Sequence, residues 1–503
     1  MNSSSHNPAS LVASFASIPR QETLARLPPS VDWVEVRGLG VPPSTSDGWR
    51  SSFQGRLLFA LPRREPPSPD SADSGLSPSE RRQRLAAAAQ AFDLVELDAE
   101  RDLDPRLLAK IPPAQRLIAW HGPPVDFAEL EQRFTELAET PARLYKLVPE
   151  ARTAAEGLAP LVLLRHLGRR DVIAFASGAG GFWTRLIAPR LGYPMVFARA
   201  EANGQRCQSP DQPVLRQLAD DYGLPALPRA DKLCGIVGCG VSRSLSPRLH
   251  NAAYRELGLS ALYLPFEAEC FPAFWRHLAT SDTLNDLGLP LAGLTVVAPH
   301  KEAACVDATP CSEFVRRAGA ANLLHRPGSA AWLADSTDAQ GVLDPLTQRN
   351  IDIRGQKAAV IGCGGAGRTI AAGLHQAGAK VALVNRSVER GRRTARRLGL
   401  PFRPLAEFDA RGFALVVHAT PLGRVAEDAT PFEVSRLDRD AVVVDLIYAD
   451  QPTTLVTAAR HRRVQVIDGR EVLLAQTRRQ LHAMTGKSLS LQQLRRFLDQ
   501  PSH

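Results

Sequence analysis

Lysine is scarce in this chain of 503 residues, although basic residues are not. Of its 61 basic residues, seven are lysines and 54 are arginines. A guanidinium supplies positive charge but keeps its proton, whereas an amine can lose its proton and act as a nucleophile or a base. Lysines flanked by apolar residues are therefore candidates for chemistry, and two fit that description, Lys146 and Lys301.

Several other features are missing. No apolar run approaches the ~18 residues needed to cross a bilayer, and the opening MNSSSHNPAS lacks the basic start and apolar core of a secretory signal, so neither is expected. All seven cysteines lie at or after Cys207 and form no CxxC pair, which predicts reduced cytoplasmic thiols and no metal site. The net charge of +9 is spread without basic blocks, which argues against nucleic acid and suits a protein that handles small anions.

The stretch Lys357–Arg390 has the order strand, glycine turn, helix, strand. An apolar run at 358–361 precedes GCGGAG, and a helical pattern then leads to a second apolar run at 380–384. This context is what a dinucleotide-binding fingerprint requires, since the glycines allow a tight turn and the helix start binds the pyrophosphate. A purely structural glycine turn is the alternative. The predicted nucleotide-binding residues are Gly362, Gly364, Gly365, Ala366 and Gly367.

The end of the second strand indicates which nucleotide binds. An NAD site places Asp or Glu there for the ribose hydroxyl, whereas this chain has Asn385-Arg386-Ser387, with Arg390 one turn further on. A neutral residue and two guanidinium groups suit a 2′-phosphate, so the predicted cofactor is NADP. The alternative is that these arginines belong to a solvated face.

Short apolar runs alternate with helical stretches from residue 11 to about 224. Eight runs in a segment of this size match a (β/α)8 barrel. The irregular segment 64–79, rich in Pro, Ser and Asp, predicts a loop after the third run. The predicted strands are Leu11–Ile18, Trp33–Arg37, Arg56–Leu61, Phe92–Leu97, Arg116–Trp120, Ala142–Val148, Asp171–Ala176 and Met195–Arg199.

Polar residues gather at the ends of these strands, where barrel enzymes place their chemistry. Lys146 is expected to point into the barrel, where loss of water lowers the amine pKa enough for imine formation. His121 is placed to move protons beside that imine, although a histidine alone would more simply be a core or loop residue. The constellation consists of Glu35, Arg37, Glu96, His121, Lys146 and Arg185.

The motifs around these residues resemble those of type I 3-dehydroquinate dehydratase over the first 225 residues. The resemblance implies that Lys146 forms a Schiff base with the substrate ketone, and that His121 removes a proton and helps the neighbouring hydroxyl leave. It also implies that Glu96 orients His121 and that Glu35, Arg37 and Arg185 bind the substrate. The motifs are VEVR (34–37), VELD (95–98), IAWHG (118–122), LYKLV (144–148) and FWTRL (182–186).

Two segments depart from that family's pattern. Pro62 stands where an arginine is usual, with Arg63 next to it. The family's Ser-Ala-Pro-Gly-Gln lid appears as QSPDQ, which places Gln208 at the serine position and keeps Gln212 as a substrate-binding residue. Both departures bear on how efficient the dehydratase is.

A proline-bearing linker over 224–230 predicts a domain boundary, and a serine-rich turn follows the next strand. Ser246 is predicted to be a helix N-cap with Pro247 in the first turn. Ser244 is not needed for that cap, so the hydroxyls and the amides at the helix start are predicted to bind a substrate carboxylate, with capping alone as the alternative.

Lys301 follows a strand-like run, and Asp338 opens a predicted helix. The two would form a proton-handling pair in which the carboxylate holds the amine and the amine serves the hydroxyl being oxidised. An ordinary salt bridge is the alternative, and the scarcity of lysine favours catalysis.

Residues 232–500 resemble shikimate dehydrogenase over essentially its full length. The resemblance implies that Ser244 and Ser246 bind the substrate carboxylate, and that Lys301 with Asp338 transfers the proton. The ring hydroxyls would be surrounded by Asn322, Asp338, Gln476 and Tyr448, and Gly469 is counted with the nucleotide-binding residues. Val297 and Ser336 stand where threonine and asparagine are usual. The motifs are SLSP (244–247), PHK (299–301), GAAN (319–322), STD (336–338), GCGGAG (362–367), NRS (385–387), HATPLG (418–423) and GREVLLAQ (469–476).

The predicted class is therefore α/β. A (β/α)8 barrel would occupy 1–229, a substrate-binding lobe 230–340 completed by 469–503, and a Rossmann NADP-binding lobe 341–468. The two predicted reactions are consecutive, because dehydration of 3-dehydroquinate gives the 3-dehydroshikimate that NADPH reduces to shikimate. The partners would be these small acids, without nucleic acid or membrane, and the oligomeric state stays open. The alternatives are a shikimate or quinate dehydrogenase with a degenerate barrel and a non-catalytic sensor of pathway acids.

Overall fold

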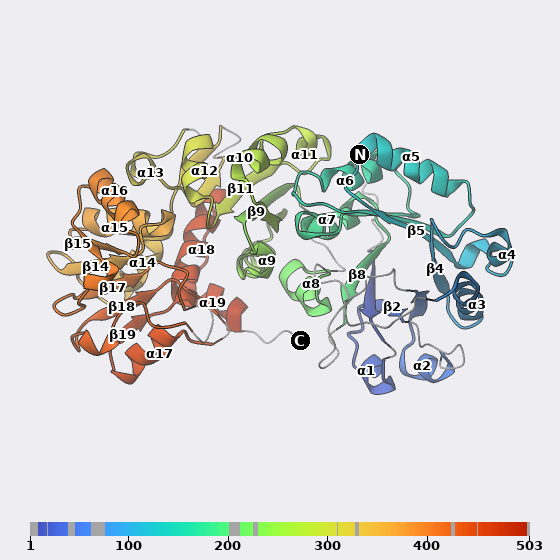
Figure 1. Cartoon of the computed structure of the whole chain (residues 1–503), viewed down its shortest axis with the longest axis horizontal. Coiled ribbons are helices and arrows are strands. Elements are labelled where there is room, and N and C mark those ends of the chain that lie inside the picture. The colour runs from blue at the N-terminus through green and yellow to red at the C-terminus, as the bar shows by residue number, and fades with distance from the viewer. Residues whose placement is uncertain are drawn as a thin grey trace. The chain divides into compact units, whose positions relative to one another are not determined.

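The structure is a computed structural model. It describes residues 9–17, 19–38, 46–61, 76–200, 212–224, 230–308, 310–326, 331–423, 428–449 and 451–499. The chain forms two compact units: Met1–Arg229 with Ser281–Gly288, and Ala230–Thr280 with Leu289–Pro501 (Figure 1).

The first unit contains one sheet of eight parallel strands, in the order β7-β6-β5-β4-β3-β2-β1-β8. Because β1 pairs with both β2 and β8, the sheet curls into a nearly closed barrel. Eight strands were predicted and eight are found, so the barrel is confirmed. The strands are β1 (Ser10–Phe15), β2 (Val31–Arg37), β3 (Arg56–Ala60), β4 (Leu94–Asp98), β5 (Arg116–Gly122), β6 (Leu144–Pro149), β7 (Val172–Ala174) and β8 (Met195–Arg199).

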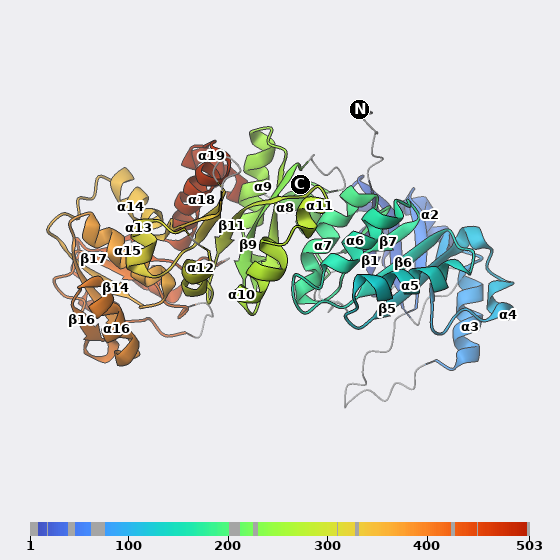
Figure 2. The ribbon, with the colours of Figure 1, turned by 90° about the horizontal axis from the view of Figure 1, so that it is seen from above.

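Helices lie outside these strands (Figures 1 and 2). Local signals fix several of them: α3 begins with a capping box between Ser77 and Glu80, and Asp126 caps α5 through the backbone N–H of Glu129. The helices are α1 (Gln21–Ala25), α2 (Ser46–Ser52), α3 (Pro78–Ala88), α4 (Pro105–Leu108), α5 (Phe127–Ala138), α6 (Leu158–Leu167), α7 (Phe182–Ile187) and α8 (Leu215–Tyr222).

Strand β6 shows how the barrel positions a charged residue. All six of its residues are buried, as expected for a parallel strand covered on both faces. The Tyr145 ring packs edge-on against Phe134 of α5, 5.9 Å between centroids, so Tyr145 faces the outer helices. Since side chains alternate along a strand, Lys146 faces the barrel interior.

The second unit begins with a mixed sheet in the order β10-β9-β11-β12-β13. Strands β9, β10 and β11 run parallel, whereas β12 and β13 are antiparallel to their neighbours. The strands are β9 (Lys232–Gly238), β10 (Ala261–Glu267), β11 (Leu291–Val296), β12 (Leu323–His325) and β13 (Leu333–Asp335). The helices in this part of the chain are α9 (Ser246–Glu256), α10 (Phe271–Phe274), α11 (Thr283–Asp286), α12 (Lys301–Asp307) and α13 (Glu313–Ala318).

A six-stranded parallel sheet follows, in the order β16-β15-β14-β17-β18-β19, which is the doubly wound order of dinucleotide-binding folds. Alternate residues of β14 enter separate apolar cores, Val360 on one face and Ile361 on the other. The strands are β14 (Lys357–Ile361), β15 (Lys380–Asn385), β16 (Phe402–Pro404), β17 (Leu415–His418), β18 (Val442–Asp445) and β19 (Gln465–Ile467). The helices are α14 (Asp338–Gln348), α15 (Gly365–Gln376), α16 (Val388–Leu398), α17 (Thr454–His461), α18 (Gly469–Thr485) and α19 (Leu491–Asp499).

One local prediction was wrong. Ser246 is not the N-cap of α9; it is the first helical residue, and the cap position belongs to Leu245. The Ser244 hydroxyl instead accepts a hydrogen bond from the Ser246 backbone N–H at 3.2 Å. Ser244, which the predicted cap did not need, therefore closes the turn, because a hydroxyl two residues earlier can reach that amide.

Candidate active sites

Lys146 is held inside the barrel by residues from two other strands. It is 1% exposed. Its Nζ lies 2.8 Å from Oε2 of Glu96 on β4 and 4.5 Å from the ring centre of Phe197 on β8. The amine is thus removed from bulk water but has a carboxylate partner, which is what a buried charge requires.

Glu96 links the lysine to His121. Its other oxygen, Oε1, lies 3.8 Å from Nε2 of His121. Burial would raise the pKa of Glu96, but the charge of Lys146 and the interaction with His121 hold that pKa well below its usual value. Glu96 was predicted to orient His121; the structure brings it against both residues.

His121 stands at the end of β5 with 27% of its side chain exposed. Loss of water is the main cause that lowers the His121 pKa to about 4; the interaction with Glu96 opposes this shift and the charge of Lys146 adds to it. The imidazole is therefore neutral at physiological pH and able to accept a proton.

Glu35 and Arg37 come from the end of β2, where Arg37 Nη2 lies 2.9 Å from Oε1 of Glu35. Glu35 is fully buried, and its Oε2 has no hydrogen-bond partner among the described residues. The guanidinium of Arg185 lies 4.2 Å from the ring centre of Phe175 and is mostly buried. The barrel thus offers two guanidinium groups and a carboxylate with one oxygen that accepts no hydrogen bond from the described residues, a set suited to binding a hydroxylated acid.

Gln212 is buried and donates a hydrogen bond to the Ser14 hydroxyl at 3.0 Å, so it is tied to strand β1. Pro62 and Gln208, the two departures noted in the sequence, lie outside the described residues.

In the second unit, Lys301 and Asp338 form the predicted pair. Nζ of Lys301 lies 2.8 and 2.7 Å from the two carboxylate oxygens of Asp338. The Asp338 side chain is 1% exposed and the Lys301 side chain 14%. Both candidate lysines are therefore shielded from bulk water, and each contacts a carboxylate.

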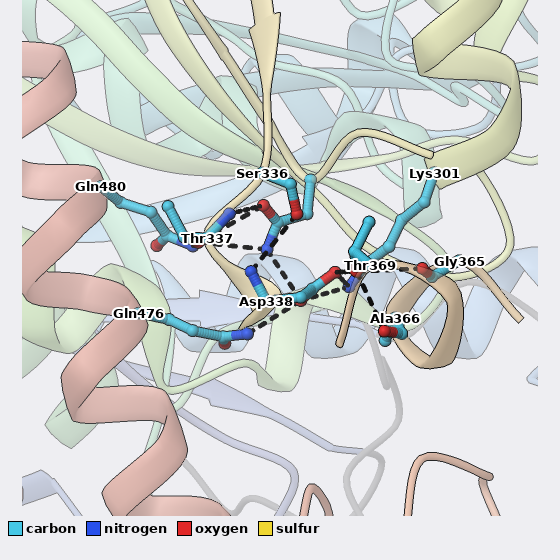
Figure 3. Close-up of polar contacts among 10 residues, drawn as sticks. Lys301, Ser336, Thr337, Asp338, Gly365, Ala366, Thr369, Gln476 and Gln480 are labelled. Atoms are coloured by element: carbon cyan, nitrogen blue, oxygen red, sulfur yellow. Dashed lines mark hydrogen bonds and ion pairs between the residues drawn. The ribbon is translucent and has the colours of Figure 1, made fainter. Parts of the chain in front are cut away.

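Asp338 is surrounded by further donors (Figure 3). Oδ1 accepts hydrogen bonds from Asn322 Nδ2 at 2.9 Å and from Gln476 Nε2 at 2.8 Å. Oδ2 accepts one from the Thr369 hydroxyl at 3.2 Å. The predicted residues Asn322 and Gln476 thus converge on Asp338. Thr369, on α15, was missed, because nothing in the sequence links it to a residue 31 positions earlier.

Further hydrogen bonds hold the residues of this cluster in place. Asn322 Oδ1 accepts from the Thr337 backbone N–H at 2.7 Å, and the Thr337 hydroxyl accepts from Gln480 Nε2 at 3.2 Å. Ser336 accepts from the Asp338 backbone N–H at 3.3 Å. Gln480 lies one turn after Gln476 on α18, and that helical spacing was the available signal for it.

Ser244 lies near Tyr448, 3.4 Å between the two hydroxyl oxygens, while Ser246 is buried at the start of α9. A residue predicted to bind the carboxylate, Ser244, therefore lies close to one predicted to lie around the ring hydroxyls, Tyr448. Their hydroxyls and the helix-start amides form a polar wall of the kind that binds a carboxylate.

The glycine turn after β14 has the geometry that close approach requires. Gly362 has a φ of +114°, which disfavours any other residue, and a Cβ on Gly367 would strike the Gly362 carbonyl oxygen. A Cβ on Gly364 would meet nothing within 4 Å, so this glycine borders open space just before α15. A dinucleotide pyrophosphate fits these features.

The residues predicted to choose the nucleotide lie at the end of β15. Asn385 Oδ1 accepts from the Cys363 backbone N–H at 3.1 Å, which ties this strand end to the glycine turn. The Ser387 hydroxyl caps α16 by accepting from the Arg390 N–H. Arg386 is exposed beside them. Gly469 instead packs against the Ile447 carbonyl, where a Cβ would clash, so its observed role is close packing.

No helix among the described residues is long and apolar enough to cross a membrane. Within the same residues, no group of three or more His, Cys, Asp or Glu side chains is placed to hold a metal ion.

Two family models match the chain. Residues 68–226 match the model described as Type I 3-dehydroquinase, and residues 236–324 match the one described as Shikimate dehydrogenase substrate binding domain.

Relatives and solved structures match the same regions. A chloroplastic bifunctional 3-dehydroquinate dehydratase/shikimate dehydrogenase of Arabidopsis thaliana is 25% identical over 379 residues, 71% of this chain and 60% of that relative, so the chain spans less than two thirds of its length. A shikimate dehydrogenase (NADP(+)) of Syntrophobacter fumaroxidans is 33% identical over 254 residues, 50% of this chain and 85% of the relative. The structure of shikimate dehydrogenase from Aquifex aeolicus has 27% identity and a TM-score of 0.49, covering 54% of this chain and 98% of that one. The dehydroquinate dehydratase and shikimate dehydrogenase from S. pombe has 20% identity and a TM-score of 0.43, covering 98% and 99%.

Proposed function

We propose that this chain, which belongs to the shikimate dehydrogenase family, catalyses two consecutive reactions. The second unit reduces 3-dehydroshikimate to shikimate with NADPH, and the barrel dehydrates 3-dehydroquinate to 3-dehydroshikimate. The observation that carries the proposal is that two scarce lysines are each shielded from bulk water against a carboxylate, Lys146 at Glu96 and Lys301 at Asp338.

In the barrel, Lys146 loses a proton and its Nζ attacks the substrate ketone, so that water leaves and a C=N bond forms. The neutral His121 then takes the proton beside the imine carbon, a C=C bond forms, and the hydroxyl one carbon further on leaves as water with the proton that His121 returns. Glu96 contacts both side chains and stays ionised, which stabilises the positive charge that passes between them. Glu35, Arg37 and Arg185 bind the hydroxyls and the carboxylate of the acid. Water finally hydrolyses the imine and frees Lys146.

In the dehydrogenase, Ser244 and Ser246 bind the carboxylate, and Asn322, Gln476 and Tyr448 bind around the ring. Lys301 and Asp338 supply a proton to the carbonyl oxygen on reduction and remove it on oxidation. The ion pair keeps both groups at the reacting oxygen, and the side-chain amides of Asn322 and Gln476 that donate to Asp338 hold its carboxylate in place. NADP, when bound, supplies or accepts the hydride.

The residues present fit NADP. Gly362, Gly364, Gly365 and Gly367 would hold the pyrophosphate at the start of α15, and Asn385, Arg386, Ser387 and Arg390 would hold the ribose 2′-phosphate. The six cysteines among the described residues are all free, which fits the proposed cytoplasmic location.

Both reactions can be tested on the full chain. We expect absorbance from the enone of 3-dehydroshikimate to rise when 3-dehydroquinate is added alone, and reduced nicotinamide to form from shikimate with NADP. Borohydride added during the first reaction should attach the substrate to Lys146, as detected by mass spectrometry. Absence of that adduct and of enone formation would leave a dehydrogenase with a degenerate barrel. If neither reaction occurred, the alternative of a non-catalytic sensor would remain. If quinate were turned over faster than shikimate, the chain would be a quinate dehydrogenase.

The lowered pKa of His121 predicts the pH dependence of dehydration. The imidazole acts as a base only when neutral, and a pKa of about 4 keeps it neutral as the pH falls from 8 to about 5. We therefore expect no loss of kcat/KM from His121 protonation near pH 6.5, and an acid limb nearer 4. The pH profile of kcat/KM measures this, with dehydrogenase activity of the same samples as the control for folding. A limb near 6.5 that His121→Asn abolishes would contradict the prediction.

A further inference from the structure

One carboxylate forms ion pairs with two arginines beside the glycine turn proposed to bind the nucleotide. Oε1 of Glu302 lies 3.0 Å from Nη2 of Arg368 and 2.7 Å from Nη2 of Arg390. Arg368 lies on α15, which starts at the glycine turn, and Arg390 lies on α16, which follows the second strand. A single anionic oxygen therefore connects the two helices at which the dinucleotide would bind.

Glu302 belongs to the part of the second unit that contains the five-stranded sheet. It follows Lys301 in the first turn of α12, and α12 packs against the glycine turn, since a Cβ on Gly365 would lie 2.6 Å from Cβ of Lys301. The contacts of Glu302 therefore tie the catalytic lysine's helix to the nucleotide-binding helices.

The charges around Glu302 do not balance. Glu302 is one carboxylate against two guanidinium groups, so one positive charge remains uncompensated. Burial lowers the pKa of Arg368; the charge of Glu302 opposes this shift, and repulsion by Arg390 and Arg393 adds to it. A phosphate monoester carries about −1.5 to −2 at pH 7 and has three acceptor oxygens, so it matches two guanidinium groups better than the single carboxylate does.

We propose that Glu302 is a specificity-determining residue, whose carboxylate competes with the 2′-phosphate of NADP for Arg390. Glu302 pairs with Arg390 at 2.7 Å; when NADP binds, the 2′-phosphate takes Arg390 and Glu302 releases it. NAD has a hydroxyl at that position and gains nothing from the exchange. Glu302 therefore tempers the affinity for NADP without affecting NAD. The inference rests on the dehydrogenase activity proposed above.

The test measures binding without turnover. Adenosine 2′,5′-bisphosphate and AMP, which differ only in the 2′-phosphate, are titrated calorimetrically into the full chain. Because two partly exposed ion pairs are lost, we expect Glu302→Gln to bind the bisphosphate about three- to tenfold more tightly and AMP within about twofold of the wild type. Glu433→Gln is the matched control: it removes the same charge from a carboxylate paired with Arg436 at 3.0 Å, and it should change neither affinity.

The double variant identifies the arginine involved. In an Arg390→Ala background, Glu302→Gln should give no gain for the bisphosphate, since the contested partner is gone. Equal affinities of the wild type and Glu302→Gln, or equal weakening of both ligands, would overturn the proposal and make Glu302 a structural link. Failure of the wild type to bind the bisphosphate would overturn it together with the NADP site. Loss of turnover alone, with the bisphosphate difference intact, would count against the dehydrogenase and not against Glu302.

Discussion

Replacing Lys146 by alanine is expected to lower dehydratase kcat by about 10⁴-fold or more, because loss of a covalent nucleophile removes the whole imine route. The dehydrogenase rate of the same protein should stay within about twofold, since Lys301 and its partners lie in the other compact unit. Enone formation and reduced nicotinamide, followed on one preparation, measure both.

The control must separate lost chemistry from lost packing. Lys146 is 1% exposed and compensates the charge of Glu96 at 2.8 Å, so alanine leaves a buried carboxylate short of a partner. Lys146→Arg keeps a positive charge there but cannot form an imine, and we expect it to be as inactive as alanine. Lys110→Ala, at an exposed lysine of the same barrel, should keep full activity. Dehydratase turnover by Lys146→Arg above about one part in 10³ of the wild-type rate would rule out the imine.

Periodic features of the fold were predictable from the sequence. Runs such as Arg56–Leu61 and Met195–Arg199 gave strands within a residue or two of β3 and β8, because a parallel strand covered on both faces is apolar throughout. The glycine turn gave β14, α15 and β15, because Gly362 and Gly367 meet steric limits that only glycine satisfies.

Contacts between distant segments were not predictable in detail. Glu96 was assigned to His121, yet it lies closer to Lys146, since β4 and β6 flank β5 and the two side chains meet inside the barrel. Ser246 was predicted to cap α9 and both serines to bind a carboxylate. Which serine closes the turn depends on where α9 begins, and a shift of one residue in that start changes the answer.

Residues whose contacts depend on distant parts of the second unit could not be identified from the sequence around them. Thr369 has the spacing of an ordinary helix residue, and only folding brings its hydroxyl to Asp338. Glu302 and Arg368 are ordinary charged residues of helices in the sequence, and their pairing depends on how α12 meets α15. The individual roles of all these site residues remain predictions.

The second large effect is expected at Lys301. Replacing it by alanine should lower dehydrogenase kcat by about 10³-fold, the usual contribution of a positioned acid–base group, with the KM for shikimate changed by less than about fivefold. The KM should hold because Ser244 and Ser246, the residues proposed to bind the carboxylate, are untouched, and because Asn322 and Gln476 still donate to Asp338. Lys487→Ala, at an exposed lysine of the same unit, is the control.

A double variant then shows whether Lys301 and Asp338 act as one device. Both oxygens of Asp338 contact the amine, at 2.8 and 2.7 Å, so each residue is needed to place the other. Asp338→Asn alone should cost about as much as Lys301→Ala, and combining the two should cost less than about tenfold more than either, since residues that act as a unit are not additive. If the two losses multiplied, the lysine and the aspartate would serve separate steps. If either variant kept a kcat near that of the wild type, the buried ion pair would be structural, and the proton would reach the substrate oxygen by another route.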